Sequence, residues 1–391
     1  MLNLIKTIRD KLFTYNLREY NLAIMVVASA LGVIGAYTLY VMPGVPERLY
    51  LKQLLGVAGG MFLAIFVSAF DYRFIAKFYI PLYLLNMVLL AAVRFTRFGV
   101  TLYGARRWLG IKDVFTFQPS ELSKVIMIVV MAKLYQMLES RLKKFYVLLI
   151  IGGIFGLQWL LIFIQPDLST SIVFALLFVI MLFASGYNYK IILALLVITV
   201  PAVIFVFWYV QQPDPLFITP NQQTRILAFL HPDDYPDVMY QQLNSVSAIS
   251  TGGLIGKQLT NDTGARGTLY VPVKESDFIY SGICEEFGFL GAVTVIVLFL
   301  ILGLCIVKIA YKASDLLGKL IAVGCACVFI SQMFVNIGVV TLLLPNTGIP
   351  LPFVSNGLSS ALSSYIMLGL VQNIAINHDI ALKKESEDYI Q

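Results

Sequence analysis

The sequence predicts an all-α polytopic integral membrane protein with about ten transmembrane helices, because a span needs about 20 apolar residues and runs of that length recur along the chain. Apolar residues make up 59% of the 391 residues, against roughly 45–50% in soluble domains. Charged residues make up 13%, half of the usual ~25%. This composition excludes a soluble globular enzyme, a disordered chain and a fibrous repeat protein.

The expected spans are apolar runs separated by polar segments. Residues 1–20 are basic, and the apolar run that follows is too long for the core of a signal peptide, so we interpret it as an uncleaved anchor. The run near 278–311 opens with polar residues, and part of it is expected at the membrane interface. The runs lie near 21–42, 51–69, 75–95, 119–137, 145–164, 169–186, 190–211, 278–311, 317–343 and 356–377.

The distribution of lysine and arginine predicts the orientation of these spans. With an even number of spans and both termini in the cytoplasm, the inner segments carry the excess of basic residues, as the positive-inside rule requires. We expect a single membrane domain over 1–391, with cytoplasmic segments at 1–20 and 378–391. One long extracytoplasmic loop, 212–275, lies between spans 7 and 8. It is too polar to span and too apolar and aromatic for a disordered linker, so we expect it to be functional.

Basic residues crowd one outer segment, between the third and fourth expected spans. The orientation rule opposes this placement, which leaves two interpretations. Either the side chains anchor the protein at lipid phosphates, or they bind a substrate. They are Arg94, Arg97, Arg106, Arg107 and Lys112.

The remaining composition narrows the partners and cofactors. The net charge of +6 reflects basic residues at the cytoplasmic face of a membrane protein, so no nucleic-acid partner is expected. The chain has two histidines, which argues against a histidine metal site and a Ser-His-Asp triad. Its four cysteines form no disulfide framework and are interpreted as small buried residues. Gly256-Lys257 is not a P-loop, because Gln258 stands where Ser or Thr is needed, and no organic cofactor is expected.

Charged residues inside the expected spans need a reason, because one at mid-bilayer costs about 2.5–3.5 kcal/mol. Glu121 and Lys124, shortly after Gln118, are three residues apart and can pair on one helix face. They form either a structural ion pair or a site facing a polar cavity. The second is favoured, because an apolar pair would insert at lower cost. Gln165 and Asp167 flank a proline in a polar turn, where Asp167 either caps a helix or belongs to a site.

The long loop enters the eighth span at Asp277, near a helix N-terminus that favours an ionised carboxylate. Ser281 and Glu285 follow at four and eight residues, which predicts one polar stripe along the helix. The alternative for Asp277 alone is a helix cap. Between the last two spans, the proline- and glycine-rich segment 344–357, which contains Ser355, predicts a rigid re-entry. Such backbone is tolerated at membrane depth only when it is buried or lines a cavity.

Seven short motifs occur in this order: Gly104-Ala105-Arg106-Arg107-Trp108, Gln118 to Lys124, Gln165-Pro166-Asp167, Gln242 and Ser245 before Gly252-Gly253, Ser276-Asp277-Phe278-Ile279, Glu285-Glu286-Phe287-Gly288, and Thr347 to Ser355. Together they resemble the SEDS family (FtsW, RodA, SpoVE), the polytopic peptidoglycan glycosyltransferases of bacteria. The likeness covers about residues 100–375.

The chain departs from the family pattern in two places. The family usually has Leu-Pro-Glu shortly before its aspartate, and here Val271-Pro272-Val273 stands there, followed by Lys274 and Glu275. After Ser355 the family usually has an aromatic residue and two glycines, and here the residues are Asn356, Gly357 and Leu358. The resemblance is therefore to a divergent member of the family.

The resemblance implies a substrate, a mechanism and partners in the bacterial cytoplasmic membrane. The substrate would be lipid II, polymerised with release of undecaprenyl pyrophosphate. Asp277 matches the proposed catalytic carboxylate and would act as the general base, and Glu121 with Lys124 matches an important intramembrane pair. A class B penicillin-binding protein, as transpeptidase, and membrane lipid are the implied partners. The substrate-binding candidates are Glu121, Lys124, Arg106, Arg107, Gln118, Gln165, Asp167, Glu285 and Ser355.

The leaving pyrophosphate would need positive charge. Arg106, Arg107, Lys124 or a divalent cation (Mg or Mn) would supply it. Two other functions use the same intramembrane charges. A lipid II flippase would use them as a translocation path, and a non-catalytic scaffold of the division or elongation complex would tolerate the loss of Asp277. The polymerase is favoured because it gives the long outer loop ending in Asp277 a role.

Overall fold

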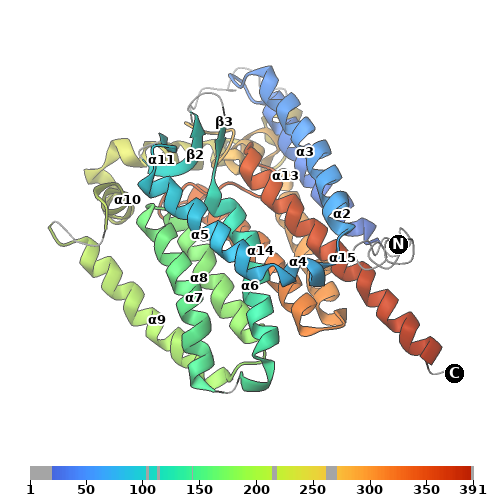
Figure 1. Cartoon of the computed structure of the whole chain (residues 1–391). Helices are drawn as coiled ribbons and strands as arrows, with labels where there is room; N and C mark the ends of the chain where they lie inside the picture. Colours follow the sequence, from blue (N-terminus) through green and yellow to red (C-terminus); the bar gives the residue numbers. More distant parts are fainter. Residues whose placement is uncertain are drawn as a thin grey trace.

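The computed structural model describes residues 20–102, 105–111, 115–142, 144–213, 218–260 and 271–388. Long helices form a bundle, and a small sheet and short helices gather at one end of it (Figure 1). The helices are α2 (Leu22–Val41), α3 (Glu47–Ser68), α4 (Tyr72–Lys77), α5 (Tyr79–Phe95), α6 (Pro119–Met137), α7 (Phe145–Ile164), α8 (Leu168–Ala184), α9 (Tyr189–Val210), α10 (Pro220–Leu230), α11 (Pro236–Thr251), α12 (Gly256–Thr260), α13 (Ile279–Lys312), α14 (Leu316–Val340) and α15 (Leu358–Asp388), with single 3-10 turns η2 (Glu139–Arg141) and η3 (Pro232–Asp234).

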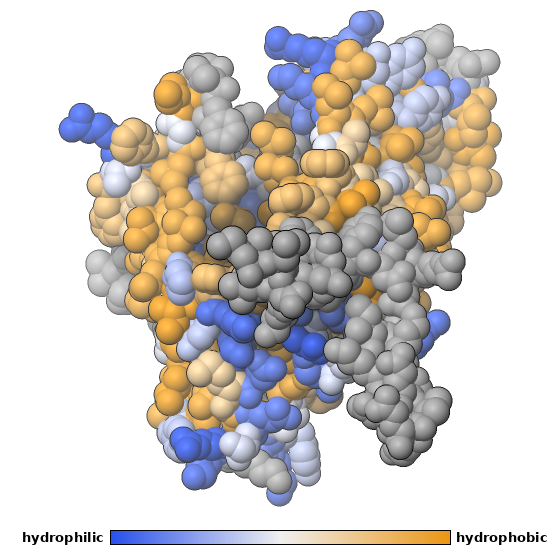
Figure 2. Space-filling view, turned by 45° about the vertical axis from the view of Figure 1, so that its right-hand side comes forward, coloured by the Kyte–Doolittle hydropathy of each residue, from blue (hydrophilic) through white to orange (hydrophobic). Residues whose placement is uncertain are grey.

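The long helices define a polytopic membrane protein. Seven of the described helices are long and apolar enough to cross a membrane, namely α2, α3, α7, α9, α13, α14 and the first part of α15. Helices α5 and α8 are apolar but shorter, at 17 residues each, and α6 carries Glu121 and Lys124 near its start. Each apolar run of the sequence therefore contains a helix. Figure 2 shows hydrophobic side chains over much of one face, as expected where lipid surrounds the protein.

Helix α14 lies at the centre of the bundle and packs against α13, α6, α8 and α15. Ile321, Cys325 and Val328 of this helix are fully buried. A Cβ added at Gly324 would lie 2.9 Å from Ile128 Cγ2 of α6. Because lipid tails are as apolar as leucine, such close approach, rather than exclusion of water, holds membrane helices together.

The expectation of an all-α chain misses a three-stranded antiparallel sheet, formed by β1 (Gly99–Leu102), β2 (Ala105–Ile111) and β3 (Phe115–Phe117). Val100 pairs with Trp108, and Leu109 pairs with Phe117. The strands lie between α5 and α6, and their shortness hides them within a segment that looks like a loop. Successive strand residues point to opposite faces, so the sheet separates the side chains of neighbouring residues.

The described part of the expected outer loop is largely helical, in α10, α11 and α12. Helices α11 and α12 pack on α13. The approach is close, because a Cβ at Gly252 would lie 1.9 Å from the carbonyl oxygen of Cys284. Helix α13 is broken at Gly288, where φ is 65°, and a Cβ there would lie 2.5 Å from the backbone N of Gly256. The polar start of this helix is thus covered by α12.

Candidate active site

Asp277 lies in the turn segment 271–278, two residues before the first residue of α13, and its side chain lines a cavity of about 270 Å³. The cavity opens at the end of the bundle that carries the sheet. Side chains from β2, α10, α11 and the 344–357 re-entry surround it, together with the start of α15. The lining residues include Arg107, Trp108, Gln118, Arg225, Gln241, Ser276, Asp277, Asn346, Gly348, Asn356 and Ser359.

Hydrogen bonds from distant segments hold the backbone around Asp277. The Asn336 side-chain amide of α14 donates to the carbonyl oxygens of Asp277 and Ile349, at 2.7 Å each. The hydroxyl of Ser355 donates to the carbonyl oxygen of Ser276 at 2.6 Å. These bonds join the carboxylate-bearing turn to the re-entry. Sequence reasoning expected Ser355 near substrate and missed Asn336, because nothing local in an apolar helix marks a backbone-holding amide.

Gly348 brings the re-entry close to the carboxylate. Its φ is +67°, in the left-handed region that favours glycine. A Cβ at this position would lie 3.0 Å from Asp277 Oδ2. The predicted rigid re-entry is therefore one wall of the site, and only glycine fits there without strain.

The surroundings of Asp277 adjust its affinity for a proton. Burial raises the pKa of its carboxyl above the usual range, and the nearby Asp167 adds to that rise. The Ser276 hydroxyl, which donates to Asp277 Oδ1 at 3.1 Å, and the guanidinium groups of Arg107 and Arg225 lower the pKa and so limit the rise. The ionised group therefore keeps the basicity that a proton acceptor needs.

Arg107 ties the sheet to the turn between α7 and α8. It is 8% exposed, its Nη1 lies 3.6 Å from Asp167 Oδ1, and its Nη2 donates to the carbonyl oxygen of Pro166. Asp167 also accepts a hydrogen bond from Thr170 N at 3.3 Å. The helix-cap interpretation of this aspartate is therefore confirmed. Its contact with Arg107 links it to the cavity, and its role as a site residue stays a prediction.

Arg225 was not among the residues expected in the site. It is the single charged residue of α10, and its Nη1 donates to the carbonyl oxygen of Asn346 at 3.5 Å. Burial lowers its pKa from a very high ordinary value, which leaves it a cation. The capping box of Thr219 and Gln222 could have predicted the helix, but only its packing brings Arg225 to the cavity.

The Glu121–Lys124 pair is closed rather than open to the cavity. Lys124 Nζ lies 2.8 Å from Glu121 Oε1, and the Ser363 hydroxyl donates to Oε2 at 3.2 Å. Both charged residues are at most 1% exposed. The expectation that this pair faces a polar cavity is wrong for the described structure, because α15 covers it with Ser363.

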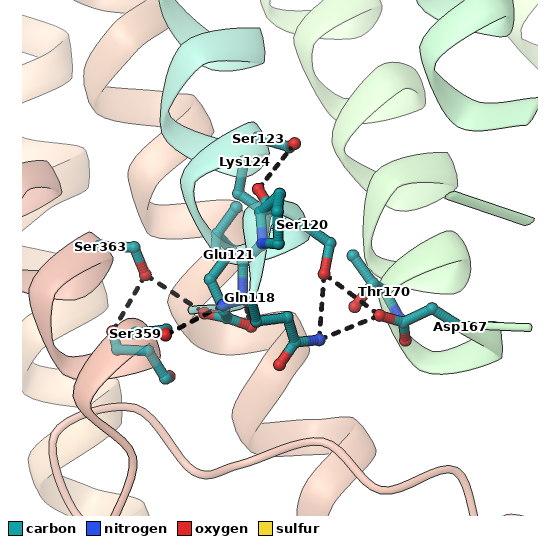
Figure 3. Close-up of polar contacts among 12 residues, drawn as sticks. Gln118, Ser120, Glu121, Ser123, Lys124, Asp167, Thr170, Ser359 and Ser363 are labelled. Atoms are coloured by element: carbon teal, nitrogen blue, oxygen red, sulfur yellow. Dashed lines mark hydrogen bonds and ion pairs between the residues drawn. The ribbon is translucent and has the colours of Figure 1, made fainter. Parts of the chain in front are cut away.

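Gln118 links the closed pair to the cavity. Its Nε2 donates to Asp167 Oδ2 at 3.1 Å and to Ser120 Oγ at 3.0 Å, and the Ser120 hydroxyl donates to the same Asp167 oxygen at 3.2 Å. Figure 3 shows Gln118 between the Glu121 region and Asp167. A continuous polar layer thus joins α6, α8 and α15 beneath the cavity.

Glu285 faces away from Asp277, so the predicted polar stripe does not form. Its Oε1 lies 2.8 Å from Lys257 Nζ of α12, and its Oε2 pairs with Lys274. Ser281 donates back to the carbonyl oxygen of Phe278. The reason is the helix start: α13 begins at Ile279, so Asp277 precedes the helix and does not share its period.

Gln165 and Arg106 also lie outside the Asp277 cavity. The Gln165 amide donates to the carbonyl oxygen of Leu90 at 2.9 Å, and Arg106 Nη2 donates to the carbonyl oxygen of Thr96. Both line a second cavity on the far side of the sheet. Lys112 belongs to the same basic outer segment of the sequence and lies outside the described residues.

The described residues at the cavity offer a metal ion few protein ligands. Among the described residues, no three histidine, cysteine, aspartate or glutamate side chains come together as a ligand set. Instead, Asp167 pairs with Arg107, and the guanidinium groups of Arg107 and Arg225 act on Asp277 from a greater distance. Arginine already provides positive charge where a divalent cation was considered.

The fold and the cavity define a class of protein: a polytopic membrane protein with a cavity at one end of its helix bundle, lined by one carboxylate of raised pKa and two arginines. Residues 13–380 match the model of the FtsW/RodA/SpoVE family, described as cell cycle proteins. The chain belongs to this family. The match covers most of the chain, so it includes every helix that contributes to the cavity.

Named relatives agree with this assignment. The chain is 34% identical over 334 residues to the probable peptidoglycan glycosyltransferase FtsW of a Geobacter species, covering 84% of this chain and 86% of that protein. It is 30% identical over 353 residues to the peptidoglycan glycosyltransferase MrdB of Escherichia coli, covering 90% and 92%.

Solved structures share the fold. A chain of a peptidoglycan synthase complex, described as coordinating polymerization and crosslinking, superposes with a TM-score of 0.76 at 25% identity, over 92% of this chain and 98% of that chain. The rod shape determining protein RodA of Thermus thermophilus superposes with a TM-score of 0.66 at 23% identity, over 91% and 96%.

Proposed function

We propose that Asp277 is the general base of glycan polymerisation from lipid II. The chain is a peptidoglycan glycosyltransferase, as the names of its relatives support. The observation that carries the role of Asp277 is its setting, since a carboxylate with a raised pKa lines a cavity together with Arg107 and Arg225. In the proposed reaction, Asp277 accepts a proton, and Arg107 and Arg225 stabilise negative charge.

In this mechanism the acceptor sugar hydroxyl attacks the anomeric carbon of the donor. Asp277 takes the hydroxyl proton as the new C–O bond forms, which general-base catalysis makes easier by about 10²–10⁴-fold. The bond from the anomeric carbon to the lipid pyrophosphate breaks, and its electron pair leaves with the pyrophosphate. Arg107 and Arg225 stabilise that anion through charge-assisted hydrogen bonds. The leaving group departs as an anion, so no second carboxyl is needed to protonate it.

The neighbouring side chains position these groups. Asp167 holds Arg107, and Gln118 holds Asp167, so the guanidinium is oriented by a fixed chain of contacts. Asn336 and Ser355 fix the turn that carries Asp277. Groups held in place before the reaction need no reorganisation in the transition state.

The proposal includes an orientation and a partner. The α5, α6 and α8 helices would cross the membrane together with the seven longer ones, with both termini in the cytoplasm and the Asp277 cavity at the outer surface. The positive-inside distribution supports this. A class B penicillin-binding protein would cross-link the product, in line with the complex whose chain shares this fold.

The test is polymerisation of lipid II by the purified full chain, with its presumed transpeptidase, scored as glycan chains on a gel. Asp277→Asn should abolish the chains while leaving the detergent-solubilised protein monodisperse. Asp237→Asn is the matched control, because Asp237 is exposed on α11. The Asp237→Asn protein should polymerise lipid II at the normal rate. Polymerisation by Asp277→Asn at the normal rate would sink the assignment of the base.

A further inference from the structure

A second cavity, of about 420 Å³, lies on the other side of strand β2 from the Asp277 cavity. Arg106 and Arg107 are neighbours on β2, and strand residues alternate between faces. Arg107 lines the Asp277 cavity, and Arg106 lines the second one. The residues of the 165–167 turn also face two different sides. Gln165 and Pro166 line the second cavity, whereas Asp167 contacts Arg107.

The second cavity carries positive charge that the described chain does not neutralise. Arg94 and Arg106 line it, and no aspartate or glutamate is among its described lining residues. Neither arginine makes an ion pair within the described part of the chain, whereas Arg107 pairs with Asp167. The buried Arg106 Nε and the buried Gln165 Oε1 have no hydrogen-bond partner among the residues that the structure describes. Two unneutralised guanidinium groups at one cavity predict an anionic ligand from outside the chain.

The surroundings of this cavity suit a ligand with apolar chains. Ile164, which lines it, is 43% exposed, and Phe95 at the end of α5 is 75% exposed. Further from the cavity along the same two helices, Val88 of α5 and Leu160 of α7 are also exposed. These two helices contact one another, and both are apolar along their length. A polar head at Arg94 and Arg106 would therefore leave its tails against the α5 and α7 faces.

We propose that this cavity binds the phosphate of a lipid, outside the Asp277 cavity. The planar guanidinium groups of Arg94 and Arg106 match phosphate oxygens, and the exposed side chains of α5 and α7 receive the lipid chains. The phosphate has two possible sources, an anionic phospholipid or the polyprenyl pyrophosphate of the proposed reaction. The binding itself does not depend on the role proposed for Asp277.

Native mass spectrometry of the full chain in detergent measures this binding directly. The probes are a phosphatidylglycerol and undecaprenyl pyrophosphate, each titrated separately. Arg94→Gln should weaken binding of at least one of them by about tenfold, the size of one lost charge-assisted hydrogen bond. Arg97→Gln is the matched control, since it removes the same charge from the same segment but does not line the cavity. Equal effects of the two substitutions, or none from Arg94→Gln, would overturn the proposal.

Asp277→Asn separates this site from the reaction cavity. It should leave the Arg94-dependent binding of the probe unchanged, whatever it does to polymerisation. If Asp277→Asn abolished that binding, the lipid would occupy the Asp277 cavity and the second site would be ruled out. The probe whose affinity responds to Arg94→Gln identifies the source of the phosphate. A response to phosphatidylglycerol indicates a site for membrane lipid, and a response to undecaprenyl pyrophosphate alone indicates a site for the released carrier.

Discussion

Two carboxylates of this protein, Glu121 and Asp277, both lie near cations, but only one remains available for chemistry. Glu121 is in contact with Lys124 at 2.8 Å and also accepts from Ser363, and it is sealed from solvent. Asp277 has no contact ion pair among the described residues, and Arg107 and Arg225 act on it across a cavity. A carboxylate in a contact pair is satisfied, whereas one held off its cations keeps a free lone pair for a proton.

Removal of Glu121 should destabilise the protein far more than removal of Asp277. Glu121→Ala leaves Lys124 as an uncompensated buried charge, which costs about 3–5 kcal/mol. The thermal midpoint of the detergent-solubilised protein should fall strongly. Glu139→Ala, at an exposed position in η2, should leave the midpoint unchanged.

Replacement of both Glu121 and Lys124 should restore the stability that is lost when Glu121 alone is removed. Glu121→Met combined with Lys124→Met removes both buried charges, and the midpoint should return close to that of the native protein. If Glu121→Ala melted like the native protein, the pair would not be the sealed structural contact that the distances indicate. Asp277→Asn in the same melting assay should show little change, because no contact pair is broken.

Gly348 tests how closely the re-entry must approach Asp277. Gly348→Ala places a methyl group 3.0 Å from Asp277 Oδ2 at a φ of +67°. We expect a cost of about 1–2 kcal/mol from the left-handed backbone, and in addition about a tenfold loss of polymerisation rate as the carboxylate shifts. Melting curves and polymerisation rates measure the two effects.

Gly44→Ala is the matched control for Gly348→Ala. Gly44 has a φ of +76°, and a Cβ there would meet no atom of the described residues within 4 Å. The backbone cost should be similar while the rate stays normal. Equal rates for the two variants would show that Gly348 serves the turn alone and not the position of Asp277.

The smallest effect concerns pH. The reaction needs ionised Asp277, so the rate should fall as pH drops through its pKa, which burial raises. Arg225 favours the ionised form, so Arg225→Gln should raise that pKa and move the acid limb of the rate profile to higher pH. The pH profile of polymerisation measures the shift.

Arg48→Gln, at an exposed position on α3, should leave this profile in place. If Arg225→Gln left the acid limb unchanged, the charge of Arg225 would not affect the pKa of Asp277. The cation that tunes Asp277 would then be Arg107 alone.

Sequence reasoning succeeded where the signal is local. Every apolar run contains a helix, because hydrophobicity over about 20 residues is a property of the run itself. The Asp167 cap and the rigid 344–357 segment were also visible in short stretches of sequence. The sheet was missed, because β1 and β3 have only 4 and 3 residues and the 7 residues of β2 do not alternate between polar and apolar side chains.

The errors about the polar residues have one cause. Glu285 was placed with Asp277 by helical spacing, but the helix begins two residues after Asp277, and Lys257 and Lys274 from other segments draw Glu285 away. Glu121 was expected at a cavity, but α15 seals it. Arg225 and Asn336 were missed because each reaches the site from a helix distant in sequence.

The sequence by itself determined that this chain is a polytopic membrane protein and which short motifs carry its polar residues, since composition, run length and spacing are local quantities. The tertiary structure alone decided which of those residues meet. It placed Arg106 and Arg107 on opposite faces of one strand. It buried the ion pair of Glu121 and Lys124. It also brought Arg225 and Gly348 close to Asp277. The physical reason is that helix packing and the sheet bring distant segments together, and spacing along the chain does not encode those contacts.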